Sequence, residues 1–573
     1  MRAGVRVSVR SGGATAAALA FGLLWAGLAQ AADAPLSNYD PSQVAARPTA
    51  PASPPLNFPA PPKGAASEDV AARFVLQGVS FDGASEVSAT RLEAAWTAFR
   101  GRSVSLADLR AIGRTAEGIY ARAGYPFVAI LLQVQEVKDG VVHFSVVEGK
   151  ITSLTVLGLN PTARRQATVM LEPLVDRAPL SLADVESAYE LARQVPGLGI
   201  SGTLRRGDRP GGMDLVVNAK REDPVRVYVN INDLYANAVG PWGMLVGADY
   251  FGTSRYGDDL SAQVYTSFPF GRQVLVRGSY AVGLNRWGTK ATISGLWGEA
   301  DPKGAAAPLQ LATNIATVRT EVSQPLIERH DASLVADAAL DISDQRTRVF
   351  RTAPLSYDKL RIFSASLLGE QSGPFGRWSG SLEIRQGLDF AGASHRGDAS
   401  LSRATGDPQA TVFKASAEAE SPTVAFFSLA ARGDVQLAAE PLTAPDQYAF
   451  GNLTIGRGYE PGAALGDSAV AGSVEVRIGP LHLWKVLEVQ PYGFVDAGRL
   501  YTRAAPTQTL SSIGGGVRIR MPGKVQLDLV YAAPQNPLIG VPHPASEVLL
   551  NLTVSVNDVF AAIHRRIAAD TKK

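Results

Sequence analysis

The second half of the chain alternates apolar and polar residues over segments of about ten positions. Branched aliphatic side chains occupy every second position in residues 225–231, and the same two-residue period returns in 474–478, 517–521 and 525–531. A period of two predicts β-strands with one apolar and one polar face. Many such segments are typical of a transmembrane β-barrel, although a soluble β-sandwich also alternates.

The lengths of the connections favour the barrel over the sandwich. About sixteen strands fit between Val225 and Phe560, an even number as in bacterial barrels. Connections after odd-numbered strands are long, and those after even-numbered strands are short. Examples of long ones are Gly298–Leu309, Gly392–Ala410 and Ala438–Asp467, and of short ones Gly252–Tyr256, Asn285–Trp287 and Pro522–Gly523. Long loops on one side only predict a barrel whose N-terminus starts on the short-turn side, the periplasm.

Two copies of one element order precede the barrel. The first predicts a strand at Phe74–Phe81, a helix capped by Ser88, a helix starting at Ser105 and ending at Gly124, and a hairpin about Asp139–Gly140. The segment Val104–Leu109 returns 76 residues later as Leu180–Val185, with Ser and Asp three apart in both copies. An echo at the same place in the same order, β-α-α-β-β, indicates tandem α+β modules.

The N-terminus predicts export. Three arginines precede an apolar run that ends at Ala29-Gln30-Ala31, which is the pattern of a cleavable signal peptide, with a retained membrane anchor as the alternative. A proline-rich linker follows, with only a weak helical segment at Asp40–Ala46 as a candidate plug helix. The expected domains are 1–31 signal peptide, 32–70 linker, 71–150 and 151–222 α+β modules, 223–560 barrel and 561–573 tail.

Composition and motifs give no indication of an enzyme. The net charge is +2 and cysteine is absent, so we expect no nucleic-acid partner, no disulfide framework and no zinc–thiolate site. The six histidines are scattered, and neither a phosphate-binding loop nor a nucleophile elbow is present. Gly514-Gly515-Gly516 stands at the expected start of a strand and is read as small residues at the lumen wall. We therefore expect no catalytic residues, cofactor or metal.

Several motifs carry a family resemblance. The segment Gly118–Tyr125 followed by Val147–Ile151 resembles the first POTRA domain of the two-partner-secretion type. Pro196-Gly197-Leu198 followed by Asp214–Val217 resembles the second POTRA domain. Over roughly residues 70–560 the chain resembles the TpsB transporters (ShlB/FhaC/HecB type), which are relatives of the BamA-type assembly factors. The resemblance implies two periplasmic POTRA domains and a sixteen-stranded barrel in the bacterial outer membrane.

The resemblance also implies a pair of site motifs in the barrel. In the superfamily an Arg-Gly-Tyr tip, here Arg457-Gly458-Tyr459, folds back into the lumen from the longest loop. It pairs there with a Phe-x-Asp-x-Gly strand motif, here Phe494, Asp496 and Gly498. A guanidinium offers a planar fork to a carboxylate, and the glycines leave room for the loop to approach. Gly456 departs from the β-branched residue that is usual before the arginine.

The family further implies the function and the partners. A monomer in outer-membrane lipid would bind an unfolded exoprotein with an N-terminal secretion domain, of haemolysin or adhesin type, and export it. We expect the exoprotein to add a strand to an exposed edge, with Gly199–Leu204 as the candidate. A terminal aromatic, here Phe560, would be recognised by the barrel-assembly machinery, although 561–573 follow it. The alternatives are a BamA-type insertase and a passive porin or receptor.

Overall fold

A computed structural model describes residues 56–58, 73–268, 270–451, 454–483 and 486–557. Within this part of the chain, no helix combines the length and the apolar character needed to cross a membrane. Three expectations lie outside the described residues: the signal peptide, the candidate plug helix, and Phe560 with the tail that follows it.

The first α+β module places a helix on a small mixed sheet. Strand β5 lies at the centre of this sheet, parallel to β2 and antiparallel to β4. Asp139 and Gly140 have positive φ angles in the turn of the hairpin, as predicted. The elements are β1 (Phe74–Val75), β2 (Gly78–Asp82), α2 (Ala89–Glu93), η3 (Thr97–Phe99), β3 (Ser103–Val104), α3 (Leu106–Arg122), β4 (Ala129–Leu132) and β5 (Val141–Val147).

The first helix of this module was predicted to run from Ser88 to Phe99, and this extent was wrong. It ends at Glu93 and is followed by a single 3₁₀ turn, and the Ser88 side chain makes no capping bond. The hydroxyl of Thr97 donates to the Glu93 carbonyl at 2.6 Å, a local bond that competes with continued helix. The second helix ends one residue earlier than expected, with Ala123 as its C-cap and Gly124 following at a φ of 96°.

The second module repeats the order of the first. Its sheet has the order β6-β8-β7, which leaves β7 at an edge. Ser105 and Ser181 both cap their helices, each accepting the N–H of the aspartate three residues on, so the predicted repeat is confirmed. The elements are β6 (Lys150–Leu157), α4 (Pro161–Leu171), η4 (Glu172–Leu174), α5 (Leu182–Arg193), β7 (Leu198–Arg206) and β8 (Gly212–Arg221).

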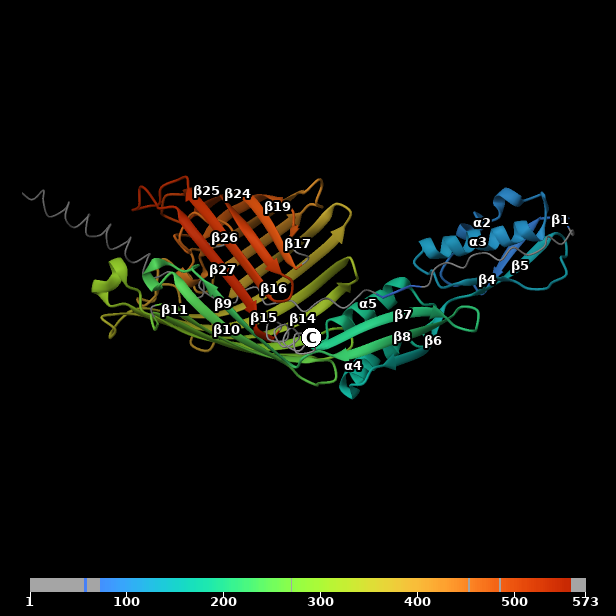
Figure 1. Ribbon diagram of the computed structural model, residues 1–573, viewed down its shortest axis with the longest axis horizontal. Coiled ribbons are helices and arrows are strands. Elements are labelled where there is room, and N and C mark those ends of the chain that lie inside the picture. The colour runs from blue at the N-terminus through green and yellow to red at the C-terminus, as the bar shows by residue number, and fades with distance from the viewer. Residues whose placement is uncertain (1–55, 59–72, 269, 452–453, 484–485, 558–573) are drawn as a thin grey trace, which may run out of the picture.

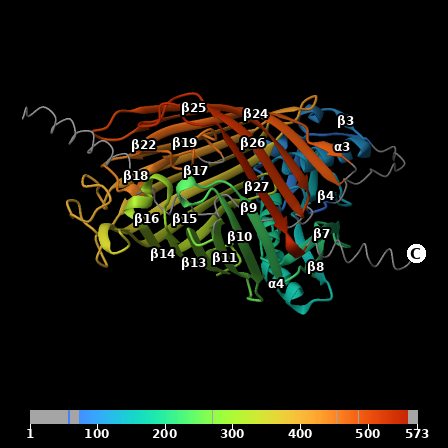
Figure 2. The same ribbon diagram turned by 60° about the vertical axis from the view of Figure 1, so that its left-hand side comes forward.

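Sixteen of the remaining strands close into an antiparallel barrel (Figures 1 and 2). The short β23 (Leu481–Leu483) only extends the hairpin of β22 and β24, which pair directly. The sixteen strands are β9 (Val225–Asn232), β10 (Trp242–Phe251), β11 (Asp258–Phe268), β12 (Gln273–Gly283), β13 (Lys290–Ala300), β14 (Ala312–Glu328), β15 (Ala332–Val349), β16 (Ala353–Gly373), β17 (Gly376–Gly387), β18 (Thr411–Glu420), β19 (Phe427–Ala438), β22 (Ser468–Ile478), β24 (Leu487–Tyr501), β25 (Gln508–Met521), β26 (Val525–Pro534) and β27 (Glu547–Ser555).

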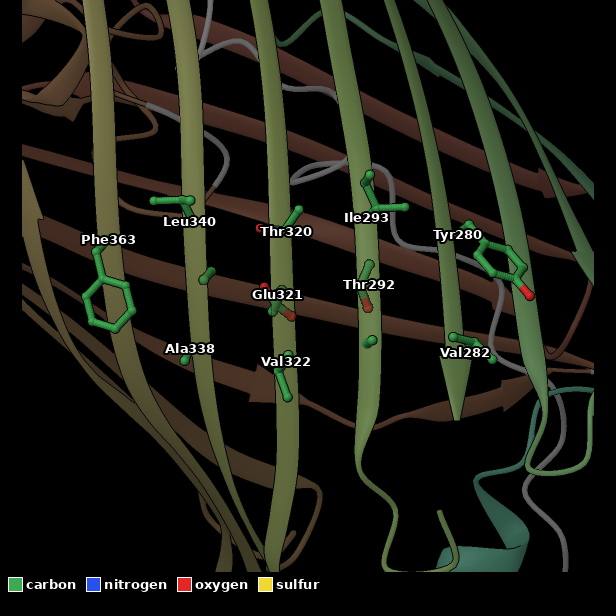
Figure 3. Close-up of a pocket in the computed structure, with 12 residues that line it drawn as sticks. Tyr280, Val282, Thr292, Ile293, Thr320, Glu321, Val322, Ala338, Leu340 and Phe363 are labelled. Atoms are coloured by element: carbon green, nitrogen blue, oxygen red, sulfur yellow. The ribbon is translucent and has the colours of Figure 1, made fainter. Parts of the chain in front are cut away.

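The two faces of the barrel wall differ as the alternation predicts. Figure 3 shows part of the wall, where Tyr280, Ile293 and Phe363 stand on the outer side. These three side chains are among many large apolar residues that are exposed on the outer surface. On β14 the exposed Val318 alternates with Arg319, which reaches Asp341 of β15 at 2.8 Å. An apolar outside and a charged lumen are what a barrel in lipid requires.

The connections are unequal on the two sides of the barrel, with three exceptions. The connections 301–311, 388–410 and 439–467 are long and follow odd-numbered strands. The connections 269–272, 350–352 and 502–507 also follow odd-numbered strands, counted in barrel order, but are short. At the second of these the strands themselves are long, since β15 has 18 residues and β16 has 21, about twice what a bilayer requires.

The barrel closes at a short seam between its first and last strands. Five residue pairs join β27 to β9, whereas eighteen join β15 to β16. Side chains supplement the seam, because the Asn230 amide donates to Asn551 at 2.6 Å and to Thr553 at 2.9 Å. The Asn557 side chain accepts the Val227 N–H at 2.7 Å.

The second module contacts the short turns of the barrel directly. Arg165 and Gln166 of α4 donate to the carbonyls of Thr253 and Ser254, both at 2.9 Å. At the next turn, a Cβ added to Gly288 would lie 2.6 Å from Leu191 of α5. The first module lies farther from the barrel, at the other end of the second (Figure 1).

Candidate functional site: a buried arginine at the lumen wall

The connection between β19 and β22 folds back against the inside of the barrel wall. Strands β20 (Tyr448–Phe450) and β21 (Ala464–Gly466) pair as a ribbon that carries the segment 454–459. Asn237, in the connection after β9, donates to the Glu460 carboxylate at 2.7 Å. This bond joins the loop, which precedes the twelfth strand of the barrel, to the connection that follows the first strand.

Arg457 is the centre of the site. Its side chain is 1% exposed, and its guanidinium bonds three side chains of two adjacent strands. Nε and Nη2 donate to the two oxygens of Asp496 at 3.0 and 2.6 Å. Nη1 donates to Glu475 at 2.6 Å, and Nη2 also donates to Ser473 at 2.7 Å. A fork against a carboxylate is the strongest geometry available to arginine.

The strand motif supplies more than one partner for the loop. Phe494, Asp496 and Gly498 point into the barrel, while Val495 between them is exposed on the outside. The Arg457 guanidinium carbon lies 3.4 Å from the centre of the Phe494 ring, a cation–π arrangement. One oxygen of Asp496 also accepts the backbone N–H groups of Gly456 and Arg457, at 3.1 and 3.0 Å. The carboxylate therefore fixes the backbone of the loop as well as its charge.

Glycines make this close approach possible. A Cβ on Gly458 would lie 2.8 Å from Ser512 Cβ, and one on Gly498 would lie 2.3 Å from the Phe450 ring. Gly456 has a φ of 82°, and a Cβ there would lie 2.6 Å from the same ring. A β-branched residue, usual before the arginine in the superfamily, would be strained in this conformation. The departure from the family pattern thus matches the observed turn.

Tyr459 anchors the far side of the tip. Its hydroxyl lies 3.0 Å from the carbonyl oxygens of both Ser511 and Asn536, and it accepts the Asn536 N–H at 3.2 Å. The ring packs against Phe450, with 5.8 Å between centroids. The tip is therefore tied to the first residues of β25 and to the connection that follows β26.

Sequence reasoning missed the outer part of the charge network. Arg518 of β25 donates to both oxygens of Glu475, at 3.0 and 3.1 Å, and to Asp528 at 3.2 Å. Arg477 donates to Glu475 at 2.8 Å. These residues alternate with outward aliphatic ones, so the two-residue period already assigned them to the lumen. Three arginines thus share three buried carboxylates, and each charge in this network is compensated.

The glycine run 514–516 was placed wrongly, since it lies in the middle of β25 and not at its start. A Cβ on Gly514 would lie 2.6 Å from the Phe494 ring, and one on Gly516 would lie 2.7 Å from the Tyr492 ring. The run therefore makes space for the aromatic rings of β24 that support the two arginines.

Comparison with known proteins identifies the family. The model of the haemolysin secretion/activation protein family ShlB/FhaC/HecB matches residues 211–521, more than half of the chain. The chain belongs to this family. A second match, to the POTRA domain of ShlB type, covers residues 74–149. The TpsB resemblance and the expected fold class are thereby confirmed.

The similar proteins are outer membrane transporters. CdiB of Escherichia coli is 25% identical over 170 residues, which is 29% of this chain and 28% of CdiB. CdiB of Escherichia coli O6:K15:H31 (strain 536 / UPEC) is 25% identical over 163 residues, 28% of this chain and 27% of that protein. The chain thus spans little more than a quarter of the length of these curated relatives.

Solved structures show the same fold over a greater length. The structure of CdiB from Escherichia coli has a TM-score of 0.72 at 17% identity and covers 96% of this chain and 100% of its own. CdiB from Acinetobacter baumannii has a TM-score of 0.63 at 14% identity, with 86% and 91% covered. At these identities the likeness shows the fold alone. As in the ShlB family, the barrel lies in the bacterial outer membrane and the POTRA domains in the periplasm.

Proposed function

We propose that this transporter secretes a partner polypeptide by two-partner secretion. The POTRA domains bind an unfolded exoprotein through its N-terminal secretion domain, and the exoprotein then crosses the membrane through the barrel. The observation that supports this proposal most is the inward loop, whose tip is held by a buried network of charges around Arg457. This network of ion pairs has a specific geometry, yet the loop tip can separate from the barrel wall without breaking a covalent bond or unfolding the barrel.

The position of the second POTRA domain supports a role in receiving the exoprotein. The second one is fastened to the periplasmic turns through α4 and α5, so its sheet edge keeps a defined position relative to the barrel entrance. Addition of a strand to β7 reads mainly the backbone of the exoprotein and suits an unfolded chain. Haemolysin-type or adhesin-type exoproteins fit this route, and the transporter would act as a monomer inserted by the barrel-assembly machinery.

Arg457→Ala tests the role of the loop. The variant leaves Asp496 without its main partner, so the loop tip loses its position. Because breaking a buried ion pair by removing one partner is strongly destabilising, we expect secretion of the exoprotein to fall at least about tenfold. Insertion of the barrel, followed by heat-modifiable migration, stays at the level of the unmodified protein. Arg319→Ala is the matched control, since Arg319 faces the lumen from β14 and pairs with Asp341. Secretion by Arg457→Ala at the unmodified level would refute the role of the loop.

Depletion in cells separates secretion from a BamA-type insertase. Loss of one exoprotein from the medium, with the other barrel proteins unchanged, supports two-partner secretion. A general loss of barrel proteins from the outer membrane contradicts it.

A further inference from the structure

A short segment of the N-terminal linker lies on the edge of the second POTRA sheet. We call Leu56, Asn57 and Phe58 the strap. Asn57 pairs in parallel with Thr203 of β7. Its N–H donates to the Gly202 carbonyl at 3.1 Å, and its carbonyl accepts the Leu204 N–H at 2.9 Å. The strap therefore occupies the strand edge expected to receive the exoprotein.

Leu56 fills an apolar socket beside this edge. It is 8% exposed and belongs to the hydrophobic core of the second POTRA domain. A Cβ on Gly202 would lie 2.7 Å both from Leu56 and from the ring of Tyr189, so only glycine leaves the socket open. Burial raises the pKa of the Tyr189 hydroxyl above its usual value, because the charged form is disfavoured away from solvent.

Phe58 contacts a second surface. Its ring stacks on Phe127, with 6.4 Å between centroids and 24° between planes. Phe127 precedes β4 of the first POTRA domain but packs into the core of the second. The strap thus bridges the junction of the two domains, with Leu56 held deeply and Phe58 held on the surface.

We infer that β7 with the Gly202 socket is a binding site for extended peptides, which the strap occupies and the exoprotein must take over. The occupant it fits is an extended segment with a large aliphatic residue two positions before an aromatic one. The inference rests on the proposed secretion function and deepens it. A segment of the same chain competes at an effective concentration on the order of millimolar, so a free peptide enters only when the strap leaves.

A labelled peptide with the sequence of residues 52–61 tests the site in the purified full chain in detergent. Leu56→Asp removes the strap from the socket, and we expect this variant to bind the peptide at least about tenfold more tightly than the unmodified protein, which corresponds to about 1.4 kcal/mol. Leu56→Asp combined with Gly202→Ala should lose that gain, because the added Cβ fills the socket. Equal affinity for the unmodified protein and Leu56→Asp overturns the proposal.

A cross-link tests whether the strap must leave. The chain contains no cysteine, so Asn57→Cys with Thr203→Cys introduces a single thiol pair at paired positions. We expect the oxidised double variant to secrete the exoprotein at less than a tenth of the level of the same double variant kept reduced. Undiminished secretion by the cross-linked protein, or failure of the thiols to cross-link, overturns the inference. Absence of secretion by the unmodified transporter would instead refute the proposed function.

Discussion

Two segments of this molecule each cover a different surface, the lumen wall and the edge of β7, and different kinds of contact hold them there. The loop tip at Arg457 lies against the lumen wall through charged side chains that are almost fully buried. The strap at Leu56 lies on β7 through two backbone bonds, one aliphatic side chain and one ring contact. The loop is held by specific side-chain contacts of Arg457 with Asp496 and Glu475, whereas the strap is held largely by backbone groups, which any extended peptide offers.

The difference indicates how each closure responds to an incoming chain. Removing one partner of a buried ion pair leaves an uncompensated charge, so the loop resists partial displacement and moves as a unit. Backbone bonds at a sheet edge can be exchanged one for one with those of a competitor. We therefore expect the strap to exchange with peptides readily, and the loop to need a larger perturbation.

The largest effect is expected from Asp496→Ala. The substitution leaves the Arg457 guanidinium and two backbone N–H groups of the loop without their shared acceptor. We expect a loss of about 3–5 kcal/mol from the free energy that holds the loop in place. Limited proteolysis of the loop in detergent measures it. Asp337→Ala, a substitution on β15 away from the loop, should leave cleavage unchanged, and equal protection of both variants would contradict the network.

A smaller effect is expected from Gly498→Ala, which leaves every charge in place. The new Cβ would overlap the Phe450 ring, so the loop must shift at a cost of about 1–3 kcal/mol. The same proteolysis should show intermediate cleavage. Gly493→Ala on the same strand is the control, because a Cβ there meets only a carbonyl oxygen at 3.9 Å. Identical cleavage of the two variants would show that the loop does not depend on close approach.

The smallest effect is expected from Phe58→Ala. It removes one stacked pair, worth about 0.5–1.5 kcal/mol, and keeps Leu56 in its socket. Hydrogen exchange at the Leu204 N–H, which donates to Asn57, should become a few times faster. Leu159→Ala changes a fully exposed side chain and should have no effect on this amide. A Leu204 rate unchanged by Phe58→Ala would show that the stacking does not stabilise the strap.

The periodic parts of the molecule could be predicted from the sequence, and the parts that depend on distant partners could not. The alternation of apolar and polar residues identified the strands and their lumen faces, because this pattern depends only on residues that are close together in the sequence. The contact of Glu475 with Arg457 and Arg518 depends on strand register, which alternation leaves open. The strap lies in a proline-rich segment without periodicity, and the burial of Leu56 depends on a glycine about 150 positions away.

The five residue pairs between β27 and β9 have a consequence for heating the barrel. Every strand of a closed barrel pairs with two neighbours, so on heating the barrel should open first at the strand pair with the fewest backbone pairings. This pair consists of the first and last strands, β9 and β27. Their separation leaves every hairpin between consecutive strands intact. The amide protons of Leu552 and Val554 face β9, whereas that of Ser555 donates to Lys524 on the other side, so those of Leu552 and Val554 should exchange with solvent at lower temperatures than the amide protons of β15 and β16.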